Sequence, residues 1–196
     1  MLKQKQKIST KAITQVSVMT ALIAVLTQIS MPLPGGVPFT LQTMGVMLAG
    51  IILGPKKGTL SVLIYVVMGA IGLPVFANFS GGFAVLLGPT GGYIVGFIFG
   101  SAIIGLLSSP IQNRVLYYIK LLIGILLGQI IIFGMGIPWL MFVLNTDLSA
   151  GLAWGLTPFI IPEIIKTALA VILGTKISAA LKTRKPPPPT HFAHPT

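Results

Sequence analysis

The chain has 196 residues, of which 54% are hydrophobic and only 8% are charged, and its formal net charge is +11. Soluble domains carry about 25% charged residues, so this composition excludes a water-soluble globule. Cysteine is absent, which excludes disulfides and cysteine metal sites, and the basic residues flank apolar stretches without interleaved aromatics, which argues against nucleic-acid binding.

Three long stretches, 12–55, 58–113 and 121–146, contain no charged residue. A helix needs about 20 apolar residues to cross a bilayer, so the longer stretches hold more than one span each. The sequence therefore predicts an all-α integral membrane protein with six transmembrane helices. Their expected positions are about 12–31, 39–53, 59–72, 93–109, 115–144 and 158–182.

Glycine and proline mark the breaks between these helices. The second helix is expected to end at Gly54 and Pro55, whereas Pro158 and Pro162 suit the first turn of the sixth. The segment 73–92 is uncharged and rich in glycine and proline, so it lacks helical continuity. Non-helical backbone at membrane depth is tolerated only where protein buries it or where it lines a cavity.

The basic residues predict the orientation of the chain. An even number of spans puts both chain ends on one side, and every Lys and Arg except Lys166 falls on that side, while the opposite loops carry only Asp147. By the positive-inside rule both termini are cytoplasmic. We expect a basic cytoplasmic N-terminus at 1–11, a membrane domain that binds the substrate at 12–182 and a disordered tail at 183–196.

Two charged residues, Glu163 and Lys166, lie within the predicted sixth helix and, being three residues apart, on one face of it. An ionisable residue inside a membrane span indicates a functional site and is expected to face the bundle interior beside a partner. Gln42, Thr43 and Asn78 fall at the same external end, which indicates a cavity for a small ligand. A buried ion pair that only fixes helix packing is the alternative.

Six short motifs follow one another along the first half of the chain: GVPFTLQT at 36–43, AG at 49–50, LG at 53–54, GLPVFA at 72–77, GG at 81–82 and GPTGGY at 88–93. In their order and spacing they resemble the BioY family, the biotin-binding S components of energy-coupling-factor (ECF) vitamin transporters. The resemblance covers residues 12–182. It implies an S-component-like bundle in the prokaryotic plasma membrane that captures biotin from outside. It also implies assembly with a transmembrane coupling subunit and two cytoplasmic ATPase subunits.

The resemblance also implies particular ligand contacts. The family uses an Asn in the loop after the third helix, and an acidic residue and a Lys three positions apart in the sixth. These positions match Asn78, Glu163 and Lys166 here, although the family's acidic residue is often Asp. Gln42, Thr43 and Tyr93 are further candidates for substrate binding.

Biotin has groups that suit these side chains. Glu163 could accept a hydrogen bond from a ureido N–H, Asn78 could donate or accept, and Lys166 could bind either the ureido oxygen or the valerate carboxylate. Apolar walls around the rings and chain are expected from Phe39, Phe76, Phe79, Phe83 or Trp154.

The family's coupling surface is a stripe of small residues in the first helix, to which two pairs here, Ser17/Ala21 and Thr20/Ala24, are an approximate match. The chain has no G-x-x-x-x-G-K-[ST] motif, so ATP would be hydrolysed by the partner subunits. Neither a catalytic set nor a cofactor or metal site is expected, because the histidines fall only in the proline-rich tail. The alternative function is a stand-alone or proton-coupled transporter of biotin or another small vitamin, in which Glu163 titrates.

Overall fold

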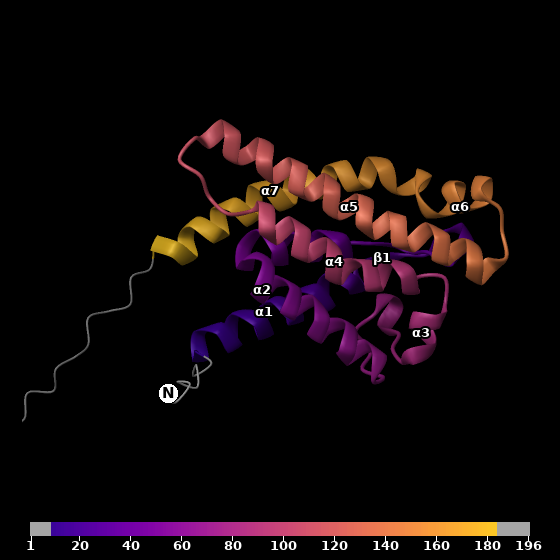
Figure 1. Ribbon diagram of the computed structural model, residues 1–196. Helices are drawn as coiled ribbons and strands as arrows, with labels where there is room; N and C mark the ends of the chain where they lie inside the picture. The colour runs from indigo at the N-terminus through magenta and orange to yellow at the C-terminus, as the bar shows by residue number, and fades with distance from the viewer. Residues whose placement is uncertain (1–8, 184–196) are drawn as a thin grey trace, which may run out of the picture.

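The computed structural model describes residues 9–183, with the side chains of the last two left aside, so the predictions for 1–8 and for the tail at 184–196 fall outside it. The chain forms a bundle of helices with one small antiparallel hairpin of strands (Figure 1). In chain order its elements are α1 (Thr10–Gln28), β1 (Ser30–Met31), η1 (Pro34–Gly36), β2 (Phe39–Thr40), α2 (Gln42–Ala70), η2 (Ala77–Phe79), α3 (Phe83–Leu87), α4 (Gly91–Leu107), α5 (Arg114–Leu144), α6 (Leu148–Gly155), η3 (Thr157–Phe159) and α7 (Ile160–Thr183).

The element α2 consists of two antiparallel helices joined at Gly54. This residue has φ 74° and ψ −173°, a conformation that is open essentially to glycine alone, and Pro55 then begins the second half. The second half lies back against the first, since Gly58 contacts the backbone of Ala49 and Gln42 Nε2 donates to Tyr65 Oη at 2.7 Å. The predicted second and third helices are therefore confirmed, together with the break between them.

The first half of α2 is short. At about 1.5 Å per residue, the 42–53 half is roughly 18 Å long, less than the roughly 30 Å of a hydrocarbon core. The prediction that this helix begins at 39 was wrong because Phe39 and Thr40 pair with Met31 and Ser30 as strands. Pro32 and Pro38 disfavour helical backbone in the residues before them, Met31 and Val37, and so keep the chain extended on both sides of the hairpin turn. The strand hairpin thus fills the space at the start of α2.

By length and composition alone, four stretches are long and apolar enough to cross a membrane, namely Thr10–Gln28, Gln42–Ala70, Arg114–Leu144 and Leu148–Leu181, while Gly91–Leu107 is shorter. Of these, Gln42–Ala70 is the hairpin folded at Gly54, and Leu148–Leu181 joins α6, η3 and α7. The six predicted helices correspond to α1, the two halves of α2, α4, α5 and α7. The helix α6 was not expected, because the sequence indicated a loop there. It begins at Asp147, whose Oδ1 accepts a hydrogen bond from the backbone N–H of Ala150 at 2.8 Å.

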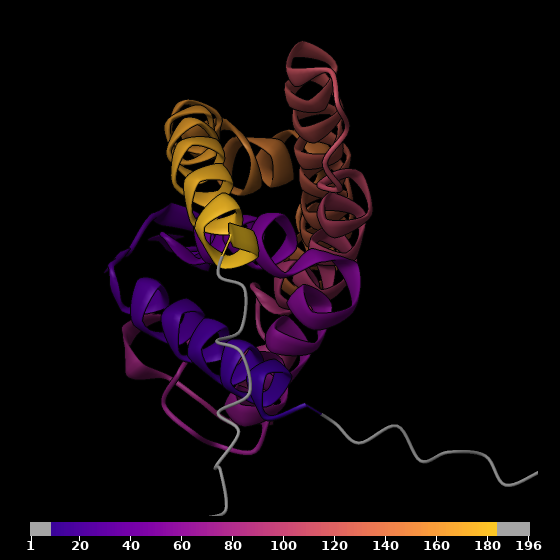
Figure 2. The same ribbon diagram turned by 90° about the vertical axis from the view of Figure 1, so that its left-hand side faces the viewer.

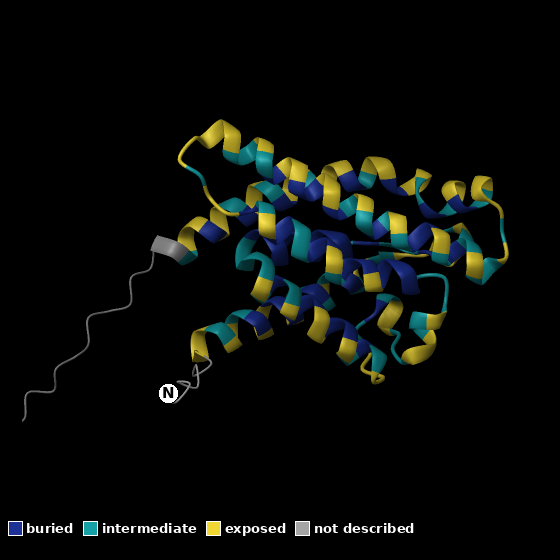
Figure 3. Ribbon diagram, viewed as in Figure 1, coloured by how far each residue is buried: buried dark blue, intermediate teal, exposed yellow. Residues whose placement is uncertain are grey.

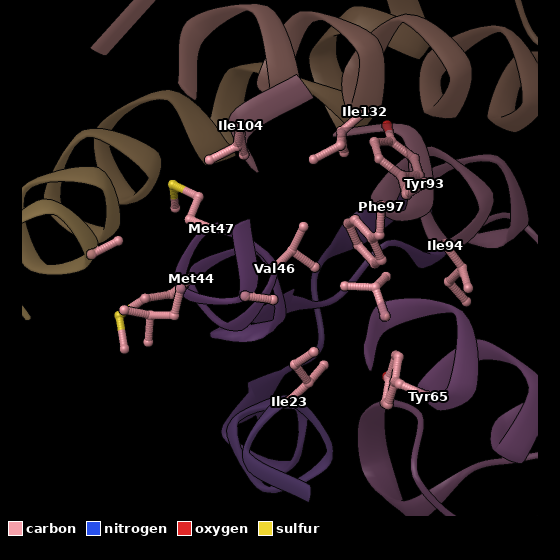
Figure 4. Close-up of a cluster of buried hydrophobic side chains, with 14 of the residues drawn as sticks. Ile23, Met44, Val46, Met47, Tyr65, Tyr93, Ile94, Phe97, Ile104 and Ile132 are labelled. Atoms are coloured by element: carbon pink, nitrogen blue, oxygen red, sulfur yellow. The ribbon is translucent and has the colours of Figure 1, made fainter. Parts of the chain in front are cut away.

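The two halves of α2 occupy the middle of the bundle, with α1 on one side and α4, α5 and α7 around the other (Figures 1 and 2). Glycines let α4 and α5 approach closely: Gly96 and Gly100 lie against Ile132, and Gly128 lies against Ile104. The buried cluster in Figure 4 joins residues of α1, α2, α4 and α5. The outward faces of α1, α5 and α7 are exposed (Figure 3). The exposed residues of these helices include many large apolar ones, as in helices that face lipid.

Candidate ligand-binding site

A cavity of about 850 Å³, including its open mouth, lies between the strand hairpin, the segment 76–80, α2, α4, α5 and the start of α7. All of the residues predicted to bind the ligand line it, although they come from distant parts of the sequence. They are Gln42, Thr43, Asn78, Tyr93, Glu163 and Lys166.

The Lys166 ammonium is almost completely enclosed, with only 3% of the residue exposed. It forms an ion pair with Glu163 Oε1 and donates to Thr43 Oγ1 at 2.7 Å and to the backbone carbonyl of Thr40 at 3.0 Å. Its Nζ also lies 5.1 Å from the centre of the Phe39 ring, within cation–π range. Three oxygen partners match the three N–H donors of an ammonium group, so the cation is fully satisfied by the protein.

The Glu163 carboxylate is 9% exposed and is held by three side chains. Its Oε1 pairs with Lys166 and accepts from Thr43 Oγ1 at 2.8 Å, while its Oε2 accepts from Gln129 Nε2 at 2.6 Å. Each carboxylate oxygen has two lone pairs, so Oε2 keeps the capacity for a second donor. The pair lines the cavity and also links α7 to α2 and α5, so it contributes to the packing of the bundle.

Gln129 was missed by the sequence reasoning. It lies within the uncharged stretch of α5, and a lone amide in such a stretch is the signal that could have found it. Its Nε2 orients the Glu163 carboxylate, and its Oε1 is buried with no hydrogen-bond partner in the described part of the chain. The Thr40 carbonyl was missed too, because no side-chain pattern reports which backbone oxygen a lysine reaches.

The side chains of Gln42 and Tyr93 each donate a hydrogen bond to another residue of the protein. Gln42 Nε2 donates to Tyr65 Oη, which lies 3.2 Å from Thr27 Oγ1. Its Oε1 accepts no hydrogen bond from residues 9–183, so this oxygen is what Gln42 offers at the cavity wall. Tyr93 Oη donates to the Gly155 carbonyl at 2.9 Å, which leaves its ring as the ligand-facing part.

Asn78 stands exposed at the cavity mouth in a left-handed backbone conformation, with φ 57° and ψ 37°, which asparagine adopts more readily than most residues. The loop around it is tied to α1 by one side chain. Gln28 donates to the carbonyls of Val75 and Phe76 at 3.2 Å each and accepts from the Phe79 N–H at 2.9 Å. These bonds hold the backbone on both sides of Asn78 in place. The side-chain amide of Asn78 has no hydrogen-bond partner among residues 9–183.

Four aromatic side chains supply much of the apolar wall: Phe76, Phe97, Phe133 and Phe159. Of the five aromatic residues expected there, only Phe76 is in the wall. The prediction was wrong for Phe79 and Phe83, which are 71% and 63% exposed, and for Trp154, which packs against Gly35. Phe39 lies beside Lys166 without lining the cavity. Apolar composition in a loop does not report which way a ring points.

The proposed docking stripe on α1 is divided between two faces. Ser17 and Ala21 are exposed, whereas Thr20 is buried and Ala24 half-buried. Thr20 Oγ1 lies 3.0 Å from the carbonyl oxygens of both Val16 and Ser61, so it fastens α1 to the second half of α2. The expectation that Thr20 is available to a partner is therefore wrong in this structure. Among residues 9–183, no group of three or more His, Asp and Glu could hold a metal ion.

A comparison with protein families shows to which family this chain is related. The model of the BioY family matches residues 3–183, nearly the whole chain. The chain belongs to the BioY family. A relative from Pyrococcus horikoshii, described as "Probable biotin transporter BioY", is 42% identical over 167 residues, which are 85% of this chain and 96% of the relative. The "Biotin transporter BioY" of Thermotoga maritima is also 42% identical over 167 residues, 85% of this chain and 95% of the relative.

A solved structure agrees with the BioY assignment. The S-component for biotin from an ECF-type ABC transporter, determined by crystallography at 2.1 Å, superimposes with a TM-score of 0.76 at 35% sequence identity. The match covers 94% of this chain and 96% of the other. The bundle described above is therefore an S-component fold, and the chain is a multi-pass membrane protein of a transporter family.

Proposed function

We propose that this chain captures biotin from the external side of the membrane and takes it up as the substrate-binding subunit of an ECF-type, ATP-driven vitamin transporter. One observation carries the proposal: the Glu163–Lys166 pair and Asn78 line one cavity in a chain of the BioY family. Relatives in this family are named biotin transporters, and the matched crystal structure is an S-component for biotin.

The direction of capture rests on where the charges lie. The start of α1, the tip of the α2 hairpin, the α4–α5 connection with the start of α5, and the end of α7 gather at one end of the bundle (Figure 1). Among residues 9–183, these segments hold every basic residue apart from Lys166. We assign this end to the cytoplasm of a prokaryotic cell, with both termini there. The cavity mouth, formed by the strand hairpin and the 76–80 segment, then opens to the outside.

Ligand capture requires an exchange of partners at Lys166. All three of its donors are used by the protein, so an arriving ureido oxygen or carboxylate must replace the Thr40 carbonyl, Thr43 Oγ1 or Glu163 Oε1. Glu163 Oε2 can accept a ureido N–H in addition to Gln129. A ligand that displaced one of these partners without supplying an acceptor would leave buried polar atoms unpaired, at a cost of about 1–3 kcal/mol each, and this cost would give the site its selectivity.

The energy for uptake would come from partners. The chain has no phosphate-binding loop of the ATPase type, so a transmembrane coupling subunit and two cytoplasmic ATPase subunits would supply ATP hydrolysis. Ser17 and Ala21 are the part of the predicted stripe that is exposed for the coupling subunit. No catalytic role is assigned to any residue.

Calorimetric titration of the purified chain with biotin, desthiobiotin and thiamine, without ATP or an ion gradient, tests the proposal. We expect tight binding of biotin, weaker binding of desthiobiotin, which keeps the ureido group and the carboxylate, and none of thiamine. Equal binding of thiamine would contradict the assignment. Gradient-driven uptake of biotin by liposomes that hold this chain alone would favour the proton-coupled alternative.

A further inference from the structure

A second cavity, of about 790 Å³ including its open side, lies at the opposite end of the bundle from the ligand site. It is enclosed by the start of α1, the tip of the α2 hairpin and the end of α7, and Figure 2 shows these three elements from that end. Its lining has a polar part, Lys11, Gln15, Lys57 and Ser178, and an apolar part, Ile52, Leu53 and Leu181.

The polar side chains of this cavity offer N–H groups that have no acceptor among the described residues, together with one hydroxyl. Lys57 Nζ donates to Gln15 Oε1 at 2.8 Å and has two further N–H groups. Because a lysine can only donate, it fixes the Gln15 amide with its oxygen toward Lys57 and leaves the NH₂ group for another partner. The Lys11 ammonium has no hydrogen-bond partner among the described residues. The cavity is therefore prepared for a ligand with several acceptor oxygens.

Ser178 is an independent sign of a ligand. It is only 7% exposed, it lines the cavity, and its hydroxyl forms no hydrogen bond within residues 9–183. Because this hydroxyl lines the cavity and has no protein partner, it can donate a hydrogen bond to an acceptor that belongs to another molecule.

The acceptor does not come from an acidic side chain of this chain. Its acidic residues are Asp147, which begins α6, and Glu163, which is paired in the ligand site. The 1–8 and 184–196 segments contain no Asp or Glu either. A carboxylate side chain that pairs with Lys11 or Lys57 would therefore have to belong to another molecule.

We propose that this cavity binds the phosphate headgroup of an anionic phospholipid from the inner leaflet. Basic pockets between helices at the cytoplasmic surface suit such headgroups, and the apolar residues Ile52, Leu53 and Leu181 provide a wall for the adjoining acyl chain. A free phosphate ion would use the donors but not this apolar wall. The inference depends on the proposed membrane orientation and not on biotin.

Native mass spectrometry of the delipidated full chain tests the inference, with added phosphatidylglycerol, phosphatidylcholine or inorganic phosphate. We expect one phosphatidylglycerol to bind at least fivefold more tightly than phosphatidylcholine. The double variant Lys11→Gln/Lys57→Gln should lose at least fivefold in affinity for phosphatidylglycerol, and Ser178→Ala at least threefold. Lys56→Gln/Lys120→Gln, which removes the same charge from the same end but outside the cavity, should remain within twofold of the parent.

Three results would overturn the inference. Equal losses in the two double variants would mean that the lipid responds only to net charge. Equal binding of phosphatidylglycerol and phosphatidylcholine would mean an unselective lipid shell. Inorganic phosphate that stabilises the chain against heat as much as phosphatidylglycerol does would mean a site for the free ion. Circular dichroism checks that each variant is folded, and because the lipid measurement uses no biotin, a failure here is separate from a failure of the proposed function.

Discussion

The two cavities of this protein differ in how their polar groups are satisfied. In the cavity of the candidate ligand site, the outer site of the proposed orientation, Glu163 and Lys166 neutralise each other and are also linked to Thr43, Thr40 and Gln129. In the second cavity, the inner site of the proposed orientation, Lys11 and Lys57 have no acidic side chain beside them. The outer site must exchange internal bonds for ligand bonds, which favours selectivity, whereas the inner site gains bonds that it lacks, which favours retention of any suitable anion.

The largest expected effect comes from breaking the outer ion pair. Replacing Glu163 or Lys166 by Ala should lower biotin affinity at least tenfold, or about 1.4 kcal/mol. It should also lower the free energy of unfolding by about 3–5 kcal/mol, because the remaining charge is buried without its partner. Calorimetry and denaturant titration measure the two effects.

The double variant Glu163→Gln/Lys166→Met separates binding from packing. With both charges removed it should regain most of the lost stability and still bind biotin at least tenfold more weakly. If the folded double variant binds biotin as the parent does, the pair is only a packing element, and the outer site must be assigned elsewhere.

A smaller effect is expected at Gln129. Replacing it by Leu removes the donor to Glu163 Oε2 and should lower the free energy of unfolding by about 1.5–3 kcal/mol, the value of a hydrogen bond to a charged group. Biotin affinity should fall as well, because the carboxylate loses its orientation. In a double-mutant cycle with Glu163→Gln the two changes should be non-additive, and strict additivity would show that Gln129 does not act through Glu163.

Two substitutions of Asn78 distinguish the contribution of its side-chain amide from that of its left-handed backbone conformation. Replacing it by Gly keeps the left-handed conformation and removes the amide, so biotin affinity should fall by roughly 1 kcal/mol without loss of stability. Replacing it by Ala should weaken binding equally and also destabilise the fold by about 1–2 kcal/mol. Thermal melts and biotin titrations compare the two, and a Gly variant with parental affinity would exclude an Asn78 contact.

The smallest effect on binding is expected on α1. Ser17→Leu enlarges a side chain on the exposed face, so biotin affinity should stay within twofold while co-purification with a coupling subunit decreases. Thr20→Val, one turn away, should mainly reduce stability, by about 1 kcal/mol, because it loses the contact with the Ser61 carbonyl. Undiminished complex formation by Ser17→Leu would move the docking surface off this face.

The sequence by itself determined the six long helices, the break at Gly54 and the charged pair of the candidate site. Uncharged stretches, proline and glycine act locally, so the helix boundaries near Gly54 and Pro162 could be read without a structure. The Glu163–Lys166 pair stood out because a charge is costly in hydrocarbon wherever the helix lies. The resemblance to the BioY family then indicated Asn78, which periodicity alone would not distinguish from a turn residue.

Only the tertiary structure decided what each side chain reaches. Gln129 and the Thr40 carbonyl contact the charged pair because α5 and the strand hairpin lie close to α7. Thr20 is buried because α1 packs on α2. The second cavity also exists only where α1, the tip of the α2 hairpin and α7 meet. Such contacts depend on the rotation of one helix against another, which is set by packing across the bundle and leaves no periodic mark in a helix that is apolar all round.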